Sequence, residues 1–156
     1  MVPFETVEAI APDSTVLVRI DLNAPVDDSG SVVDTRRFDR HAASVDTLAA
    51  AGHRVVCLAH QGRPGGEAFL SLAQHAALLD AKTAAPVGFV DAVTEPRALA
   101  AIDALAAGEA LLLENVRMHP DELPEAAPAA KAETDLVETL AAAVDWYVDD
   151  AYSVAH

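Results

Sequence analysis

Short, mostly apolar runs alternate along this chain with longer amphipathic segments, and this alternation constrains the fold more than any other sequence feature. A short run without polar alternation is typical of a strand that is buried on both faces of a parallel sheet. Runs of this kind are Thr15–Ile20, Arg54–Ala59, Ala110–Leu113, Trp146–Val148 and a weaker one, Val87–Val90. A mostly parallel sheet is therefore predicted.

The segments between these runs carry helix signals. Arg37–Ala51 is followed by Gly52, which suits the left-handed conformation that often ends a helix. Pro96–Ala107 begins with proline and is followed by Gly108, the usual asymmetry of helix ends. Further helices are predicted at Leu72–Leu79 and at Ala130–Val144, the latter with Leu136, Val137, Leu140 and Ala141 on one face. The sequence thus predicts an α/β domain with a doubly wound, mostly parallel sheet in a Rossmann-like, three-layer arrangement.

The net charge is −15 over 156 residues, and the basic residues are eight arginines and only two lysines. Such a chain is expected to repel nucleic acid and anionic membranes. Two interpretations of the charge stay open. One is an acidic surface for a protein partner. The other is adaptation to high salt, which we favour because the carboxylates are spread along the whole chain instead of forming a tail.

Targeting features favour a soluble, cytoplasmic protein. Phe4–Asp13 holds three acidic residues and no long apolar stretch, so it does not resemble a signal peptide. No apolar run reaches the length of about 18 residues that a membrane span needs. The single cysteine, Cys57, excludes a disulfide within the chain and a cysteine-rich metal site.

Polar residues that follow the predicted strands indicate a binding site. The carboxyl ends of parallel strands meet at one edge of the sheet, where open α/β folds bind their ligands. The residues expected at this edge are Asp21, Asn23, His60, Arg63 and Arg117, with Arg36 on the approach to the first helix. Arginine forks match carboxylate and phosphate oxygens, while Asp and Asn pair with hydroxyl groups. The implied ligand is small, anionic and hydroxylated.

Signatures of several other sites are absent. The chain has no G-x-G-x-x-G dinucleotide fingerprint, no P-loop sequence and no G-x-S-x-G nucleophile elbow. Its six histidines lack the spacing of a zinc site, and we expect no metal site in this chain.

Five motifs, in the right order, resemble the phosphoglycerate kinase family. Val16–Pro25 is similar to V-L-V-R-V-D-F-N-V-P, and His60–Pro64 resembles the loop H-x-G-R-P. Ser71 and the residues after it resemble S-L-x-x-V-A. Leu111–Arg117 is similar to L-L-L-E-N-x-R, and Tyr147–His156 resembles Y-V-N-D-A-F-G-T-A-H. The resemblance implies that residues 1–156 form the N-terminal, substrate-binding domain of such an enzyme.

The resemblance also implies how the substrate is held. Asp21 and Asn23 would contact the hydroxyl and carboxylate end of 3-phosphoglycerate. His60, Arg63 and Arg117 would hold the same molecule, the two arginines chiefly at its phosphate. These implied contacts agree with the anion site that the strand ends indicate.

Arg36 is implied as the catalytic arginine, which would lie at the transferring phosphoryl group and stabilise transition-state charge. Its neighbours Arg37 and Arg40 are then expected to be helix-face charges. The implied reaction is reversible phosphoryl transfer between 1,3-bisphosphoglycerate and ADP, giving 3-phosphoglycerate and ATP, by an enzyme that is a monomer when complete. Mg-ATP or Mg-ADP would be bound by a nucleotide-binding half that this chain lacks.

Departures from the family pattern leave two functions open. Gln61 stands where the family often has Leu, Asp149 where Asn is usual, and Met118 replaces a common Phe; we interpret all three as tolerated variation. The family pattern continues after His156 with a further phosphate-binding arginine and a final strand. The sheet is thus expected to be incomplete at its C-terminal end, and the isolated chain to be inactive. One hypothesis is a part of a kinase, and the other is a stand-alone module that binds an organic phosphate without catalysis.

Overall fold

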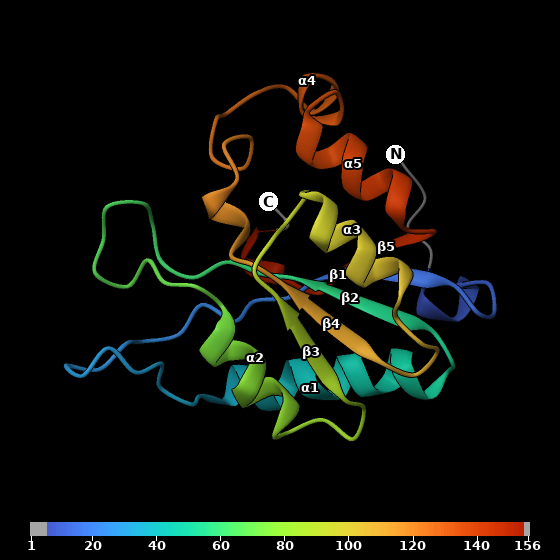
Figure 1. The fold of residues 1–156 in the computed structure, drawn as a ribbon, viewed down its shortest axis with the longest axis horizontal. Coiled ribbons are helices and arrows are strands. Elements are labelled where there is room, and N and C mark those ends of the chain that lie inside the picture. The colour runs from blue at the N-terminus through green and yellow to red at the C-terminus, as the bar shows by residue number, and fades with distance from the viewer. Residues whose placement is uncertain (1–5, 155–156) are drawn as a thin grey trace.

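The computed structural model describes residues 6–154, which form one five-stranded sheet (Figure 1). Its strands are β1 (Thr15–Arg19), β2 (Arg54–Leu58), β3 (Val87–Val90), β4 (Ala110–Leu113) and β5 (Trp146–Asp149). Their order across the sheet is β3-β4-β2-β1-β5, and every neighbouring pair is parallel. The predicted parallel α/β fold is confirmed, and no predicted strand bound differs from the observed one by more than one residue.

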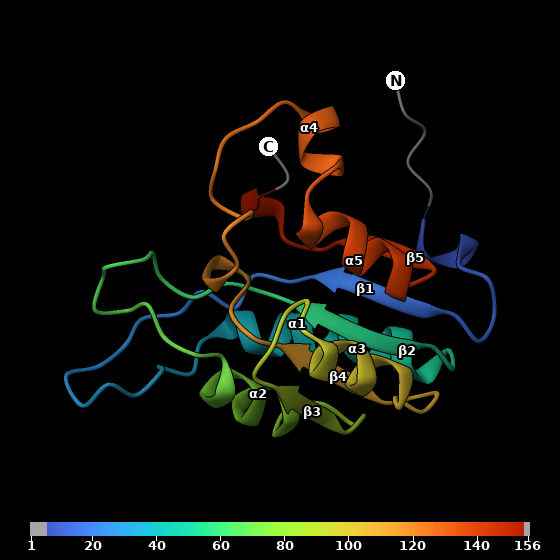
Figure 2. The ribbon, with the colours of Figure 1, turned by 45° about the horizontal axis from the view of Figure 1, so that its top comes forward.

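Helices cover both faces of the sheet (Figure 2). The helices are α1 (Arg36–Ala50) and α2 (Ala73–Asp80) on one face, and α3 (Pro96–Asp103), the short α4 (Pro128–Ala132) and α5 (Asp135–Ala143) on the other side. Val16 and Val18 of β1 pack in the core under α1 and α2, whereas Leu17 packs in the core under α3 and α5. Because both faces of the central strands are buried, apolar residues occupy successive positions along them.

Short 3-10 turns complete the described chain at Val7–Ala9, Val116–Met118 and Tyr152–Val154. None of the helices within residues 6–154 combines the length and the apolar character that a membrane span requires.

The turn after α1 shows how the sequence directs the chain back into the sheet. Gly52 has a φ of +87°, and its N–H donates a hydrogen bond to the Ala49 carbonyl oxygen at 2.9 Å. A residue with a Cβ would be strained in this left-handed conformation. The predicted helix end before Gly52 is confirmed, and β2 begins two residues later at Arg54.

The predicted helix Ala130–Val144 is wrong in its continuity, because α4 and α5 occupy this region as two separate helices. The break lies at Thr134, whose backbone is extended and whose Oγ1 donates to the Lys131 carbonyl oxygen at 2.7 Å. A hydroxyl that bonds to the preceding turn competes with helical hydrogen bonding, and such a residue is better suited to the start of a new helix.

The apolar face of α5 is also narrower than predicted. Leu136 and Leu140 are buried against the sheet, whereas Val137 is 38% exposed and Ala141 is exposed. Residues one position apart on a helix are rotated by about 100°, so a contact face centred on the two leucines turns their neighbours outward. Val137 and Ala141 instead line a groove that also includes Tyr147 of β5.

Candidate functional site

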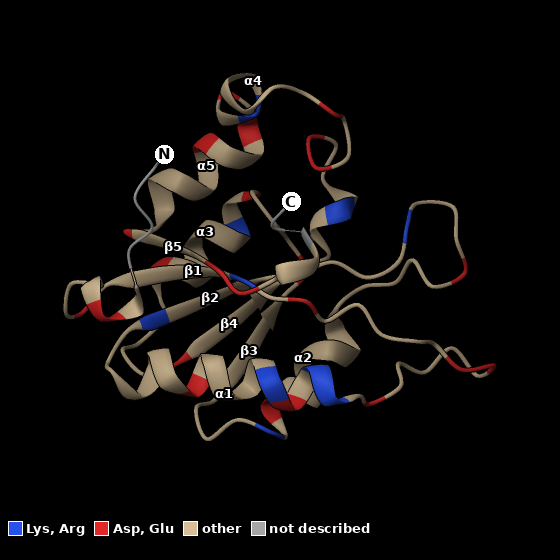
Figure 3. Ribbon diagram, turned by 180° about the vertical axis from the view of Figure 1, so that it is seen from behind, with Lys and Arg blue, Asp and Glu red and all other residues tan. Residues whose placement is uncertain are grey.

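Arginines gather around the carboxyl ends of β1 and β2. In Figure 1 this edge of the sheet, on the left, carries two long loops formed by residues 20–35 and 59–72. Of the eight arginines in the chain, six lie here: Arg19, Arg36, Arg37, Arg40, Arg63 and Arg117. Figure 3 shows the basic and acidic residues from behind. In a chain with a net charge of −15, this local concentration of positive charge indicates an anion site.

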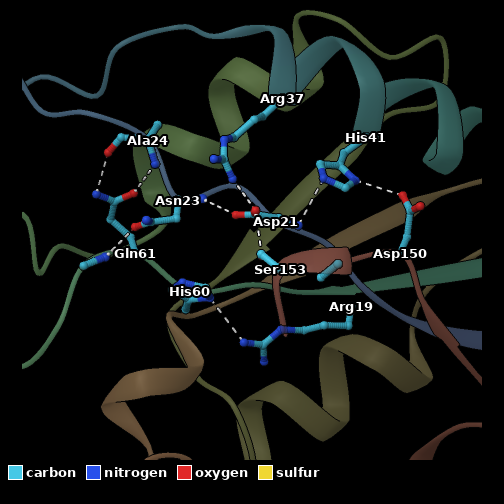
Figure 4. A network of polar contacts seen from close by, with 12 residues as sticks. Arg19, Asp21, Asn23, Ala24, Arg37, His41, His60, Gln61, Asp150 and Ser153 are labelled. Atoms are coloured by element: carbon cyan, nitrogen blue, oxygen red, sulfur yellow. Dashed lines mark hydrogen bonds and ion pairs between the residues drawn. The ribbon is translucent and has the colours of Figure 1, made fainter. Parts of the chain in front are cut away.

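Asp21 follows β1 and is held by three parts of the chain (Figure 4). Its Oδ2 accepts a hydrogen bond from Ser153 Oγ at 2.9 Å and pairs with the Arg37 guanidinium, while its Oδ1 accepts from the Asn23 N–H at 3.2 Å. Burial would raise the pKa of Asp21, but the Ser153 hydrogen bond and the Arg37 charge outweigh burial and leave the pKa lowered. The carboxylate is therefore ionised and its orientation is fixed.

Arg37 is the arginine of α1 that reaches Asp21. The expectation that Arg37 is a helix-face charge is therefore wrong. The helix begins at Arg36, one residue earlier than predicted, so its first turn lies over the end of β1. Arg36 lines a pocket of about 620 Å³ together with Asp21, Arg37, Arg40 and Tyr152, and its implied catalytic role stays a prediction.

His60 follows β2 and lies against the last residue of β1. Arg19 Nη2 is 3.3 Å from His60 Nδ1 and 3.2 Å from Glu122 Oε1. A guanidinium can only donate, so Nδ1 accepts and the neutral ring carries its proton on Nε2. Burial, together with the charges of Arg117 and Arg19, lowers the pKa of His60 to about 4. At neutral pH His60 is therefore an uncharged hydrogen-bond donor beside the arginines.

At Gly62, the loop after β2 is hydrogen-bonded to the segments that follow β1 and β4. The Gly62 N–H donates to Asn23 Oδ1 at 2.9 Å, and its carbonyl oxygen accepts from Arg117 Nη1 at 2.7 Å. Gly62 has a φ of +66°, and a Cβ there would lie 2.4 Å from the Ala68 carbonyl oxygen. Only glycine fits this position, which explains the glycine in the motif His60–Pro64.

Arg117 and Arg63 complete the basic side of the site. Burial lowers the pKa of Arg117, Glu122 opposes this shift, and the charges of Arg19 and Arg63 add to it. Arg117 Nε has no hydrogen-bond partner among the described residues, and Arg63 is exposed. The guanidinium groups of Arg117 and Arg63 thus keep hydrogen-bond donors that no protein group accepts from among the described residues. An anion-binding site requires donors of this kind.

Gln61 is fully buried beneath the site, and its side chain makes four hydrogen bonds. Its Oε1 accepts from the Ala24 N–H and from His75 Nε2, both at 2.9 Å. Its Nε2 donates to the carbonyl oxygens of Ala24 at 2.9 Å and of Ala68 at 3.1 Å. Burial lowers the pKa of His75 to about 4, so this ring is neutral. Gln61 and His75 thus form a buried polar pair, a relation that the sequence alone did not reveal.

We expect Gln61→Leu to lower the free energy of unfolding by about 2–4 kcal/mol, because it leaves His75 Nε2–H and the main-chain groups of Ala24 buried without partners. Adding His75→Val removes one of these groups and should restore about 1 kcal/mol or more. Urea unfolding of the four chains of this double-mutant cycle, in molar KCl, measures both effects. Strictly additive effects would contradict the pairing.

The stability of the chain is expected to fall as the pH decreases through the window between 6.5 and about 4. His60 and His75 have pKa values of about 4 in the fold, against the ordinary value of 6.5. Within this window the unfolded chain binds more protons than the folded chain, so the free energy of unfolding rises with pH. Urea unfolding at constant KCl concentration, from neutral pH downward, measures this dependence.

Carboxylates also titrate in acid, so the pH dependence needs a matched control. The chain with both Gln61→Leu and His75→Val lacks one of the two histidines but keeps the acidic surface. Its loss of stability between neutral pH and about pH 4 should be shallower than that of the unsubstituted chain. Identical slopes for the two chains would show that protonation of His75 does not destabilise the fold.

The described residues of the site do not form a cluster of metal ligands. Across the part of the chain that the structure describes, no group of three or more His, Cys, Asp or Glu side chains is arranged to hold a metal ion. The site's chemistry comes from guanidinium groups, one neutral imidazole, and the side chains of Asp21 and Asn23. Groups of these kinds can bind and orient an anion, and none of them is placed as a nucleophile.

The all-parallel, doubly wound sheet and the arginine-rich edge define the chain as a Rossmann-like α/β domain with its polar site at the strand ends. A family model described as phosphoglycerate kinase matches residues 8–156. The chain therefore belongs to the phosphoglycerate kinase family.

Curated relatives and solved structures agree with this membership. The chain is 56% identical to the phosphoglycerate kinase of Halorubrum lacusprofundi, over all of this chain and 38% of that protein. It is 51% identical to that of Haloarcula vallismortis, over all of this chain and 39% of that protein. The crystal structure of phosphoglycerate kinase from Pyrococcus horikoshii superposes with a TM-score of 0.91 at 30% identity, covering 96% of this chain and 37% of that one. The chain thus spans well under half the length of these relatives, the first two of which come from halophilic archaea.

Proposed function

We propose that this chain is the N-terminal, substrate-binding domain of a phosphoglycerate kinase, and that it holds 3-phosphoglycerate or 1,3-bisphosphoglycerate at the carboxyl edge of its sheet. Family membership and the arginine-rich edge support this proposal. In the proposed reaction, the bond between phosphorus and the acyl oxygen of 1,3-bisphosphoglycerate breaks. A bond from the same phosphorus to a terminal phosphate oxygen of ADP forms, giving ATP and the carboxylate of 3-phosphoglycerate.

The observation that carries the proposal is the division of the arginines into two groups. Arg63 and Arg117 lie after β2 and β4, whereas Arg36 and Arg37 begin α1 beside Asp21. A ligand with a phosphate at one end, a carboxylate or acyl phosphate at the other and a hydroxyl between them matches this division. Guanidinium forks bind the two anionic ends, and an ionised Asp accepts a hydrogen bond from the hydroxyl.

The catalytic arginine is proposed to lie in the first turn of α1, with Arg36 as the candidate. Arg37 is already paired with Asp21, whereas Arg36 forms no ion pair with any residue between 6 and 154 and lines the adjoining pocket. An arginine that is free in the resting chain is available to neutralise charge on the transferring phosphoryl group. Arg37 would instead keep the Asp21 carboxylate ionised and in place.

Mg-ATP or Mg-ADP is proposed to bind outside this chain. Phosphoglycerate kinases use these nucleotides, and the described residues here do not fit a metal ion, since no cluster of suitable ligands is present among them. When bound, the nucleotide supplies the phosphoryl acceptor or donor. The complete protein is proposed to be a cytoplasmic monomer, and the net charge of −15 supports the absence of nucleic-acid and membrane partners.

A calorimetric titration of the chain with 3-phosphoglycerate, in molar KCl, tests the proposal. Arg63→Ala is the informative variant because Arg63 is exposed and its loss should not unfold the domain. We expect it to weaken binding by about tenfold or more, the effect of one charge-assisted contact. A chain that is folded by circular dichroism but does not bind would contradict the proposal. Equal affinity for 3-phosphoglycerate and inorganic phosphate would instead favour a general phosphate-binding module.

A further inference from the structure

His41 is a fully buried polar residue that the proposed reaction does not use. It lies on α1, one helical turn after Arg37, so both side chains extend from the same face toward the end of β1 (Figure 4). His41 Nε2 accepts a hydrogen bond from the Asp21 N–H at 3.2 Å, and its Nδ1 is 2.9 Å from Asp150 Oδ2. The ring therefore joins the end of β1 to the segment that follows β5.

These two contacts determine which nitrogen of His41 carries the proton. Nε2 receives a main-chain N–H, so it has no proton of its own. A neutral imidazole has one proton, which is then on Nδ1 and is donated to Asp150. Asp150 Oδ2 also accepts from Ser44 Oγ at 2.7 Å, which fixes the carboxylate that orients the ring.

We propose that His41 is a positioning residue that holds Asp21 in its binding orientation, with Asp150 fixing the tautomer that makes this possible. The inference rests on the proposed function of Asp21. Two side chains of α1 contact Asp21: Arg37 pairs with the Asp21 carboxylate, and His41 accepts a hydrogen bond from the Asp21 main-chain N–H. Ser153, three residues after Asp150, donates to the same carboxylate, so the segment after β5 reaches Asp21 both directly and through His41.

The surroundings of His41 argue against a role in packing alone. Its neighbours on the buried face of α1 are apolar, among them Phe38, Ala42 and Val45. An apolar side chain would fill this volume without the cost of burying an imidazole. It would also leave the Asp21 N–H without its partner, and a buried unpaired N–H is costly. A histidine at position 41 is thus explained by its contacts with Asp21 and Asp150.

Two substitutions at position 41 separate these contacts. In His41→Gln, the side-chain amide reaches the position of Nε2 and can still accept from the Asp21 N–H. In His41→Asn, the shorter amide keeps a donor near Asp150 but leaves the Asp21 N–H unpaired. We expect His41→Asn to weaken 3-phosphoglycerate binding by about tenfold and His41→Gln to stay within about threefold of the unsubstituted chain. Equal losses in the two variants would indicate packing alone and overturn the proposal.

NMR spectroscopy tests the same proposal without a ligand. Long-range ¹H–¹⁵N correlations of the histidine ring should show the neutral Nδ1–H tautomer for His41, and the Nε2–H tautomer would overturn the proposal. The Asp21 amide proton should exchange faster with solvent in His41→Asn than in His41→Gln, and equal exchange rates would also overturn it. If the unsubstituted chain did not bind 3-phosphoglycerate, the proposed function would fail, while these two measurements would still decide whether His41 holds Asp21.

Discussion

Arg117→Ala is expected to weaken the binding of 3-phosphoglycerate by about a hundredfold or more, the largest effect of any single substitution at this site. Arg117 has two functions in the structure. The charges of Arg19 and Arg63 act on its guanidinium group. Its Nη1 donates a hydrogen bond to the carbonyl oxygen of Gly62, the residue immediately before Arg63. Its removal therefore deletes one proposed anion contact and the hydrogen bond that holds the loop carrying Arg63, the other proposed contact. Calorimetry in molar KCl measures the loss.

Arg54→Ala is the matched control for this prediction. Arg54 begins β2 at the opposite edge of the sheet, where it pairs with Asp13 at 2.9 Å. Both variants change the net charge by the same amount, so a long-range effect of charge would weaken binding equally in the two. We expect Arg54→Ala to bind like the unsubstituted chain. Arg117→Lys should fall between them, because a lysine keeps the charge but not the bidentate fork.

The positions of the strands, and the polar residues at their ends, were predictable because both depend on local sequence signals. A strand buried on both faces must be apolar at successive positions, and Val16–Val18, Val55–Leu58 and Ala110–Leu113 show this pattern. The ends of parallel strands share one edge whatever the exact strand order, so Asp21, His60 and Arg117 could be placed together from sequence alone. The edge strands β3 and β5 are only half-buried, and Val87–Val90 was accordingly the weakest signal.

Two kinds of feature could not be predicted from the sequence: the direction in which a side chain points from its helix, and contacts between residues far apart in the chain. Arg36 and Arg37 are about 100° apart around the helix axis, so a shift of one residue in the helix start decides which of them faces Asp21. His41 and Asp150 are 109 positions apart in the chain, and no local pattern connects them. Gln61 looked like tolerated variation because its partner His75 is identified only when the helix α2 packs beneath the loop.

The melting temperature of the chain is expected to rise by about 20 °C or more when KCl is increased from about 0.1 M to about 3 M, because screening shortens the range of repulsion between charges from about 10 Å to less than about 3 Å. The net charge of −15 is spread over every part of a 16.3 kDa chain. Only 4% of the residues are aromatic, so the core is built mainly from small and aliphatic side chains, each of which buries less apolar area than an aromatic ring to offset that repulsion.

A variant with less negative charge distinguishes screening from a general effect of salt on apolar burial, which would act on any folded chain. Asp103, Glu125 and Glu133 are exposed, and their side chains form no ion pair within the described residues. Replacing all three with lysine should raise the melting temperature in dilute buffer and reduce its increase in KCl. An unchanged increase would mean that salt strengthens apolar burial. A melting temperature independent of KCl in both chains would mean that the fold does not require salt. The acidic surface would then be explained by the binding of a protein partner.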